Sequence, residues 1–277
     1  MITEMINLSL DYASMGLENG GYSPRLQTYI TENSPEMRPE RLRPAVVICP
    51  GGGYEMTSDR EAEPIALQFA ANGFQAFVLR YSVKPAVFPT ALAELAYTVG
   101  FIRDNAKKWH VDADKIIIAG FSAGGHLAAS LGVFWNEPFL SKLLHTESAH
   151  IRPNGLLLSY PVITSGEFAH RGSFTCLLGS RYDELLEYVS LERRVNALTP
   201  PTFLWHTWED DCVPCENSLL FAQALKRSGV CLELHIYPRG GHGLSLANEE
   251  TSCENGYGIE TDCQTWVPMA MRWAKSL

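Results

Sequence analysis

The chain has 277 residues, a length that one α/β domain can hold around a single core. Hydrophobic residues make up 46% and charged residues 19%, which is ordinary for a soluble globular enzyme. There are 22 basic and 31 acidic side chains, so the formal charge is −9. Because such a surface repels nucleic acid and anionic membranes, these partners are excluded and small neutral or cationic molecules are favoured.

The amino terminus shows no basic segment followed by an apolar one, so we expect no signal peptide, and no apolar run is long enough to cross a bilayer. The seven cysteines are odd in number and scattered, which suits free thiols in a reducing cytoplasm better than a disulfide framework. Cys212 and Cys215 form a C-x-x-C pair, but no second pair with metal-site spacing accompanies it. We therefore predict a cytoplasmic protein without a metal site.

In chain order, two antiparallel strands are expected first, at about residues 4–10 and 25–31, joined by a turn at Gly20 and Gly21. Apolar strand-like runs then alternate with helical patterns. The expected strands lie at 45–49, 75–81, 115–119, 155–160, 202–206 and 232–237. The expected helices lie at 61–72, 91–109, 124–134, 216–228 and 264–275. This alternation predicts one α/β domain over residues 1–277, with a mainly parallel sheet covered by helices on both faces.

The segment at about 165–198 interrupts the alternation with polar and aromatic patches and modest helical periodicity. Two interpretations stay open. An insertion of this length in an α/β domain is often functional and can form a small lid that shapes the substrate pocket. The alternative is a packing insertion that does not contact the substrate.

A short β-branched strand runs into a glycine-rich turn within residues 115–126, which read K-I-I-I-A-G-F-S-A-G-G-H. Ser122 stands between Gly120 and Gly124, in the pattern G-x-S-x-G. A sharp turn from strand to helix exposes the serine side chain above the sheet edge and holds its backbone in a strained conformation. This context favours a nucleophilic serine over the alternative, a turn that only starts a helix.

A nucleophilic serine needs a general base, and the base needs a group that holds its tautomer. His242 follows the last expected strand between glycines, so its loop can bring the imidazole over Ser122. His206 is the closest rival, but it precedes the acidic cluster at 209–211 instead of following it. Within that cluster Asp210 is the expected acid and Asp211 the next candidate. Three consecutive acids cannot all point at one ion, so no metal site is expected there.

Acyl transfer also needs donors aimed at the oxyanion. The strand at 45–49 runs into P-G-G-G-Y, where consecutive glycines let backbone N–H groups face a cavity. We expect the amides of Gly52, Gly53 and Ala123 to form the oxyanion hole. Three glycines after a strand can instead cradle a phosphate, but the chain has no G-x-G-x-x-G and no P-loop lysine.

Four aromatic residues lie beside these motifs: Tyr54, Phe121, Tyr160 and Trp208. They are candidates for the walls of a small substrate-binding pocket, and we assign Tyr54, Phe121 and Tyr160 to that role. Each of them can equally belong to the core.

Together, Pro50–Tyr54, Gly120–Gly125, Asp210–Pro214 and Gly240–Leu244 resemble the α/β-hydrolase superfamily. More narrowly, they resemble its esterase/lipase branch, which includes acetyl-xylan-esterase-like and hormone-sensitive-lipase-like carboxylesterases. The resemblance covers about residue 45 to the carboxyl terminus. It implies an α/β-hydrolase fold and a serine esterase without a cofactor, working through an acyl-enzyme with the triad in the order serine, acid, histidine.

One position departs from the family pattern. The family's usual histidine before the glycines is Pro50 here, so the bracing of the oxyanion loop must come from elsewhere. Just beyond the loop, Arg60 and Glu61 are candidates to buttress it or to line the pocket. The simpler account is a helix cap by Ser58, with Glu61 three residues on.

We therefore predict a serine carboxylesterase for short-chain acyl esters, and the resemblance favours acetyl groups on a sugar. One alternative is an amide-directed hydrolase, such as an arylformamidase or small peptidase, with the same triad. Another is a noncatalytic binding protein that keeps the fold. A homodimer is compatible with either enzyme, although no sequence feature identifies an interface.

Overall fold

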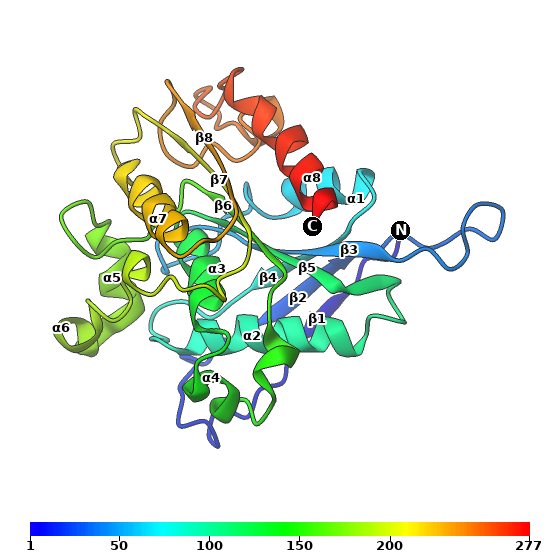
Figure 1. The fold of residues 1–277 in the computed structure, drawn as a ribbon, viewed down its shortest axis with the longest axis horizontal. Helices are drawn as coiled ribbons and strands as arrows, with labels where there is room; N and C mark the ends of the chain where they lie inside the picture. The colour runs from blue at the N-terminus through cyan, green and yellow to red at the C-terminus, as the bar shows by residue number, and fades with distance from the viewer.

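One eight-stranded sheet forms the centre of the protein, in the spatial order β1-β2-β4-β3-β5-β6-β7-β8 (Figure 1). A computed structural model describes all 277 residues. The strands are β1 (Met5–Asn7), β2 (Arg25–Tyr29), β3 (Arg43–Cys49), β4 (Gln75–Arg80), β5 (Val111–Phe121), β6 (Gly155–Ser159), β7 (Thr202–Thr207) and β8 (Leu232–Tyr237). β1, β2 and β4 pair antiparallel, whereas β4, β3, β5, β6, β7 and β8 pair parallel. The predicted mainly parallel sheet with antiparallel N-terminal strands is confirmed.

Helices cover both faces of the sheet (Figure 1). They are α1 (Glu63–Ala71), α2 (Thr90–Asp104), α3 (Ala123–Phe134), α4 (Pro138–Leu143), α5 (Arg171–Leu178), α6 (Tyr182–Leu185), α7 (Glu216–Arg227) and α8 (Trp266–Ser276). Apolar residues of α2, α3 and α7 belong to one hydrophobic cluster, and those of α1 and α8 belong to another. The two clusters lie on opposite faces of the sheet.

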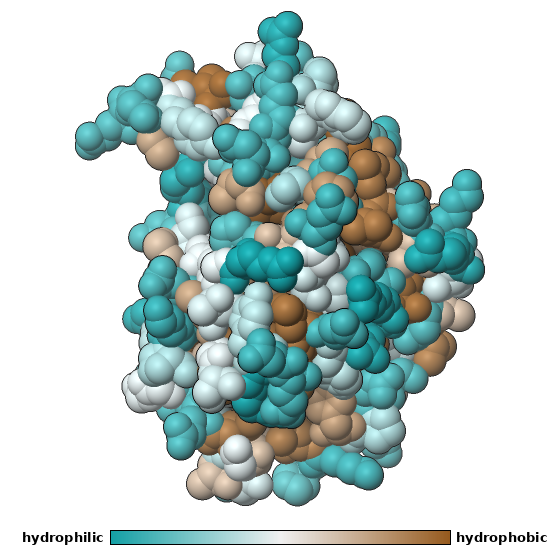
Figure 2. All heavy atoms as spheres, turned by 90° about the vertical axis from the view of Figure 1, so that its left-hand side faces the viewer, coloured by the Kyte–Doolittle hydropathy of each residue, from teal (hydrophilic) through white to brown (hydrophobic).

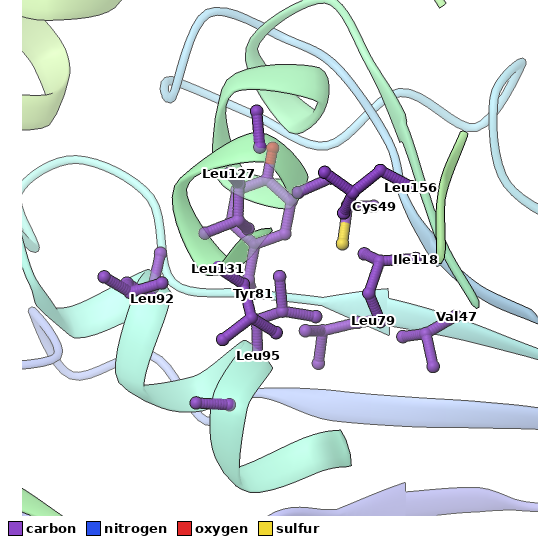
Figure 3. Close-up of a cluster of buried hydrophobic side chains, with 14 of the residues drawn as sticks. Val47, Cys49, Leu79, Tyr81, Leu92, Leu95, Ile118, Leu127, Leu131 and Leu156 are labelled. Atoms are coloured by element: carbon purple, nitrogen blue, oxygen red, sulfur yellow. The ribbon is translucent and has the colours of Figure 1, made fainter. Parts of the chain in front are cut away.

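Alternation along the strands explains the two clusters. Successive side chains of a strand point to opposite faces. On β3, Val47 and Cys49 therefore join the cluster under α2 and α3, while Val46 and Ile48 join the cluster under α1 and α8. Figure 3 shows the first cluster, in which strand residues such as Ile118 meet leucines of the two helices. Strands buried on both faces read as the continuous apolar runs seen in the sequence.

The boundaries of the expected helices lie within two residues of the sequence-based expectation, except at the end of α2. The helix expected at 61–72 begins at Glu63, with a proline in its first turn. The helix expected at 91–109 ends at Asp104, and Asn105 is its C-terminal cap residue. The Asn105 side chain donates to the carbonyl of Phe101 at 2.8 Å. The residues that follow turn back into β5, which begins at Val111 and is longer than expected.

A buried carboxyl group joins the N-terminal segment to the sheet. Glu94 on α2 is 0% exposed and has no basic partner. Its Oε1 accepts from the Tyr12 hydroxyl at 2.7 Å and from the Ser82 hydroxyl, and its Oε2 accepts from the Ser82 amide at 2.7 Å. Burial raises the pKa of Glu94, although these hydrogen bonds act in the opposite direction.

The segment 165–198 lies between β6 and β7 and carries α5 and α6 at the left of Figure 1. Hydrogen bonds tie it to the rest of the protein: the Leu191 amide donates to the carbonyl of Ile163, and the Asn217 side chain donates to the carbonyl of Phe168. Figure 2 views the molecule from this side and shows mainly hydrophilic atoms with scattered apolar patches. Over the whole chain, every helix is too short or too polar to cross a bilayer.

Candidate active site

Ser122 occupies the sharp turn between β5 and α3. Its φ of 53° and ψ of −119° lie where a residue with a Cβ is strained. The flanking glycines make the turn possible. A Cβ on Gly120 would stand 2.3 Å from the carbonyl oxygen of Gly124, and a Cβ on Gly124 would stand 2.1 Å from the carbonyl oxygen of Cys49. The spacing G-x-S-x-G therefore reflects close backbone packing around the serine.

His242 and Asp210 reach Ser122 from two other strand ends. His242 follows β8, and its Nε2 lies 2.7 Å from the Ser122 Oγ. Its Nδ1 lies 2.7 Å from Asp210 Oδ2. The structure thus brings the three predicted residues together in one hydrogen-bonded chain at the carboxyl edge of the sheet. Asp211, the other candidate acid, is exposed.

Asp210 is held as an ionised carboxylate by several donors. Its Oδ1 accepts from the amides of Cys212 at 3.1 Å and Val213 at 2.9 Å. Its Oδ2 is shared between His242 and His206, the latter at 3.2 Å. Burial alone would raise the pKa of Asp210, but the hydrogen bonds from the two imidazoles lower it well below its usual value. The charge needed to orient His242 is therefore kept.

His206 is a donor to Asp210 that the sequence did not indicate. Its Nε2 also lies 2.9 Å from the Val213 carbonyl, which can only accept, so this nitrogen carries the proton. Its Nδ1 lies 2.7 Å from the Ser218 hydroxyl, which donates to it. The rival base is thus wholly buried with both ring nitrogens engaged, and it cannot approach Ser122.

The oxyanion loop follows β3. Gly52 has φ of 130° and Gly53 has φ of 66°, and a Cβ on Gly52 would stand 2.3 Å from the carbonyl oxygen of Met56. The amides of Gly52 and Gly53 donate to no protein acceptor, whereas the Gly51 amide is taken by Glu61. Ala123 is the first residue of α3, where amides have no intrahelical acceptor. These three amides are therefore free to bind an anionic oxygen.

The helix-capping interpretation of Ser58 and Glu61 is wrong. α1 begins at Glu63 with Ala62 at the N-cap position, and no side chain caps it. Glu61 is instead 4% exposed. Its Oε2 accepts from the Gly51 amide at 2.7 Å and its Oε1 accepts from the Tyr160 hydroxyl at 2.7 Å. The carboxyl group of Glu61 thus braces the loop that lacks the family's histidine.

The structure places the three proposed pocket aromatics in the core. Phe121 is 0% exposed and shares the face of β5 that packs under α8. Tyr160 is 1% exposed, and Tyr54 donates from its hydroxyl to His126 Nδ1 at 2.9 Å. These observations favour the packing alternative for all three side chains. Trp208, by contrast, is exposed.

A sheet of this order, with a serine after β5 and its histidine after β8, defines an α/β-hydrolase. The chain belongs to the BD-FAE family, whose model matches residues 33–225. The resemblance seen in the sequence motifs is thereby confirmed.

The chain is also similar to three known proteins. Endo-1,4-beta-xylanase B of Butyrivibrio fibrisolvens is 40% identical over 83% of this chain and 36% of its own length. Acetylxylan esterase of Xylanibacter ruminicola is 31% identical over 73% of this chain and 41% of its own. The chain thus spans less than half the length of these two curated relatives. The solved structure of an acetyl ester-xyloside bifunctional hydrolase from Caldicellulosiruptor lactoaceticus is 36% identical, with a TM-score of 0.83 covering 99% of this chain and 96% of that one.

Proposed function

We propose that this chain is a serine carboxylesterase. The observation that carries the proposal is the hydrogen-bonded chain from Ser122 Oγ through His242 to Asp210, beside the free amides of the oxyanion loop. A hydroxyl, a base and an orienting carboxylate in this order are the parts that acyl transfer needs.

In the proposed reaction, Ser122 Oγ attacks the ester carbonyl while His242 Nε2 takes its proton. The amides of Gly52, Gly53 and Ala123 donate to the oxyanion of the tetrahedral intermediate. His242 then gives the proton to the departing alcohol, which leaves an acyl group on Ser122. Water, deprotonated by His242, then attacks that acyl group. His242 returns the proton to Ser122 Oγ as the bond to the acyl group breaks and the acid leaves, and Asp210 holds the imidazole throughout.

For the substrate, we propose short acyl esters, with acetyl groups on carbohydrate foremost. The support comes from one relative named an acetylxylan esterase and from a solved structure named an acetyl ester-xyloside bifunctional hydrolase. The net charge of −9 agrees with a neutral substrate of this kind.

The insertion at 165–198 is proposed as one wall of the substrate pocket. A Cβ on Gly53 would stand 4.0 Å from the Ser173 hydroxyl of α5, so the insertion borders the oxyanion loop. Beside it, His170 Nδ1 lies 2.8 Å from the same hydroxyl. The segment therefore stands close enough to the loop to limit the size of the acyl or alcohol group.

We also propose a cytoplasmic location. All seven cysteines are free thiols, and Cys212, Cys231 and Cys253 are exposed. Exposed thiols persist in a reducing compartment.

Two assays test the function. The purified protein is treated with a fluorophosphonate probe and assayed on p-nitrophenyl acetate, acetylated xylo-oligosaccharides, N-formyl aromatics and aminoacyl amides. We expect labelling of the native protein, none of Ser122→Ala, and the highest kcat/KM on acetyl esters. A preference for the amides by orders of magnitude would overturn the esterase assignment, and no labelling of native protein would favour a binding protein.

A further inference from the structure

Glu61 stands directly beneath the nucleophile and the oxyanion loop. A Cβ placed on Gly51 would lie 2.7 Å from Glu61 Oε2 and 2.9 Å from Ser122 Cβ, so the carboxyl group and the serine flank the same glycine. Glu61 Oε2 takes the Gly51 amide, which fixes the peptide just before the two free amides. The position of those amides therefore depends on the position of this carboxyl group.

The other oxygen of Glu61 leads to the histidine loop. Glu61 Oε1 accepts from the Tyr160 hydroxyl, and the same hydroxyl accepts from the Ser245 amide at 2.9 Å. Ser245 lies three residues after His242. The Tyr160 ring also contacts His242 directly, with ring centroids 5.2 Å apart at an interplanar angle of 72°. Tyr160 thus contacts the His242 imidazole with its ring and holds the loop that follows His242 with its hydroxyl.

The neighbouring residue reinforces the same connection. The Arg60 carbonyl accepts from the Ser245 hydroxyl, and Arg60 Nε donates to the Thr251 carbonyl at 2.6 Å. The segment between the oxyanion loop and α1 is therefore bonded to the histidine loop through both side chains and main chain.

We infer that Glu61 and Tyr160 are positioning residues that hold the oxyanion loop and the His242 loop in one fixed relation to Ser122. Neither side chain is placed to touch a substrate, because both are buried behind the loop. The inference rests on the proposed esterase function and adds to it the part that replaces the missing histidine at Pro50.

The hydrogen-bond directions explain why a carboxyl group stands at position 61. The Gly51 amide and the Tyr160 hydroxyl both donate, so position 61 must accept on two oxygens. A glutamine offers one acceptor and one amino group. If the amino group faces the Gly51 amide, two donors meet and the loop has to shift. If it faces the phenol, the Tyr160 hydroxyl can only accept from it, and the hydroxyl proton loses its acceptor at position 61. Burial and the adjacent Glu61 charge raise the pKa of Tyr160 well above its usual value, so the phenol keeps the proton that it donates.

The experiment compares Glu61→Gln, Tyr160→Phe and the double variant with the wild type on p-nitrophenyl acetate. A displacement of about 1 Å in a catalytic group costs about 100-fold in rate, so we expect Glu61→Gln to lower kcat by 30- to 100-fold, with KM changed by less than about threefold. Tyr160→Phe keeps the ring and removes only the hydroxyl, and we expect a loss of about tenfold. The double variant should lose about as much as Glu61→Gln alone, because the two residues act as one unit.

Glu94→Gln serves as the matched control, since Glu94 is an equally buried carboxyl group that accepts from hydroxyls and an amide away from Ser122. We expect it to lower the melting temperature and to leave kcat unchanged within about twofold.

The inference is overturned if Glu61→Gln and Tyr160→Phe keep wild-type kcat, if their losses multiply in the double variant, or if Glu94→Gln loses as much kcat as Glu61→Gln. Should Glu61→Gln fail to fold, Tyr160→Phe alone decides. An inactive wild type that the fluorophosphonate does not label would instead defeat the proposed function.

Discussion

Asp210 and Glu94 are two buried carboxyl groups with opposite electrostatics. Both accept several hydrogen bonds, yet the pKa of Asp210 is lowered and that of Glu94 is raised. The difference lies in the donors, because Asp210 accepts from two imidazoles and two backbone amides, whereas Glu94 accepts from two hydroxyls and one amide. Burial raises the pKa of any carboxyl group, and strong donors are needed to overcome that effect. The comparison shows that burial and hydrogen bonding alone do not mark a catalytic acid.

The largest expected effect is a loss of activity when the Asp210 carboxylate is removed. Asp210→Asn removes the charge and supplies a donor where His242 Nδ1 needs an acceptor. We expect kcat to fall by a factor on the order of 10⁴, as for the triad aspartate of a serine protease. The measurement is steady-state hydrolysis of p-nitrophenyl acetate. Asp211→Asn is the matched control at an exposed position and should stay within about twofold of wild type; damage there with a silent Asp210→Asn would reassign the acid.

The next effect is on stability and comes from His126, a buried imidazole that has no carboxylate partner. Burial lowers the pKa of His126 to about 4, against an ordinary value of 6.5, although its bond to the Val189 carbonyl acts the other way. Between these values the unfolded chain binds a proton that the folded protein excludes, so stability falls as the pH is lowered from 6.5 towards 4. The expected total is about 3 kcal/mol.

His126→Gln removes this imidazole, so the free energy of unfolding of the variant should lack the part of the pH dependence that His126 contributes. Urea unfolding at a series of pH values compares the two proteins. Parallel curves for wild type and variant between pH 6.5 and 4 would contradict the buried neutral imidazole.

A smaller effect on stability is expected when the Glu94 carboxyl group is replaced. Glu94→Gln places an amino group against one of the donors from Tyr12 or Ser82, and an unsatisfied buried donor costs about 1–3 kcal/mol. Thermal unfolding should show the loss, while kcat/KM should stay at the wild-type value. A stability unchanged from wild type would mean that the three hydrogen bonds contribute no net free energy.

The smallest effect is expected at Tyr257, whose hydroxyl donates to the His242 carbonyl at 2.6 Å from an exposed position. Tyr257→Phe removes one exposed hydrogen bond, worth about 1 kcal/mol or less. We expect kcat to fall by about two- to threefold, as measured on p-nitrophenyl acetate. A loss near that of Asp210→Asn would show that the loop depends on this contact alone.

The features that could be predicted from the sequence are those that short local patterns determine. The alternation of apolar strands and helices identifies the sheet, and the turn around Ser122 and the loop of His242 each carry their own short signal. The burial of Phe121 could also have been predicted. Because side chains alternate along a strand, Phe121 lies on the same face of β5 as Ile117 and Ala119, and α8 covers that face.

The support of the site was not predictable in the same way. Glu61, Tyr160 and Ser245 come from three separate connections, and their hydrogen bonds depend on how the loops converge after folding. For His206 the sequence showed only a position at the end of a strand. That position suggested a rival base, whereas in the structure His206 donates to Asp210. The one available signal was Pro50, since a loop that lacks its usual brace requires another.

The contact between α3 and β3 has a consequence for how this enzyme can diversify. A Cβ on Gly124 would collide with the carbonyl oxygens of Cys49 and Pro50, so the start of the nucleophile helix rests on the main chain that leads into the oxyanion loop. The distance between the attacking hydroxyl and the stabilising amides is therefore set by the backbone and does not depend on the side chains around the site. We therefore expect that exchanging residues of the 165–198 insertion, the proposed wall of the substrate pocket, changes the choice of alcohol or acid and leaves the shape of the reaction centre unchanged.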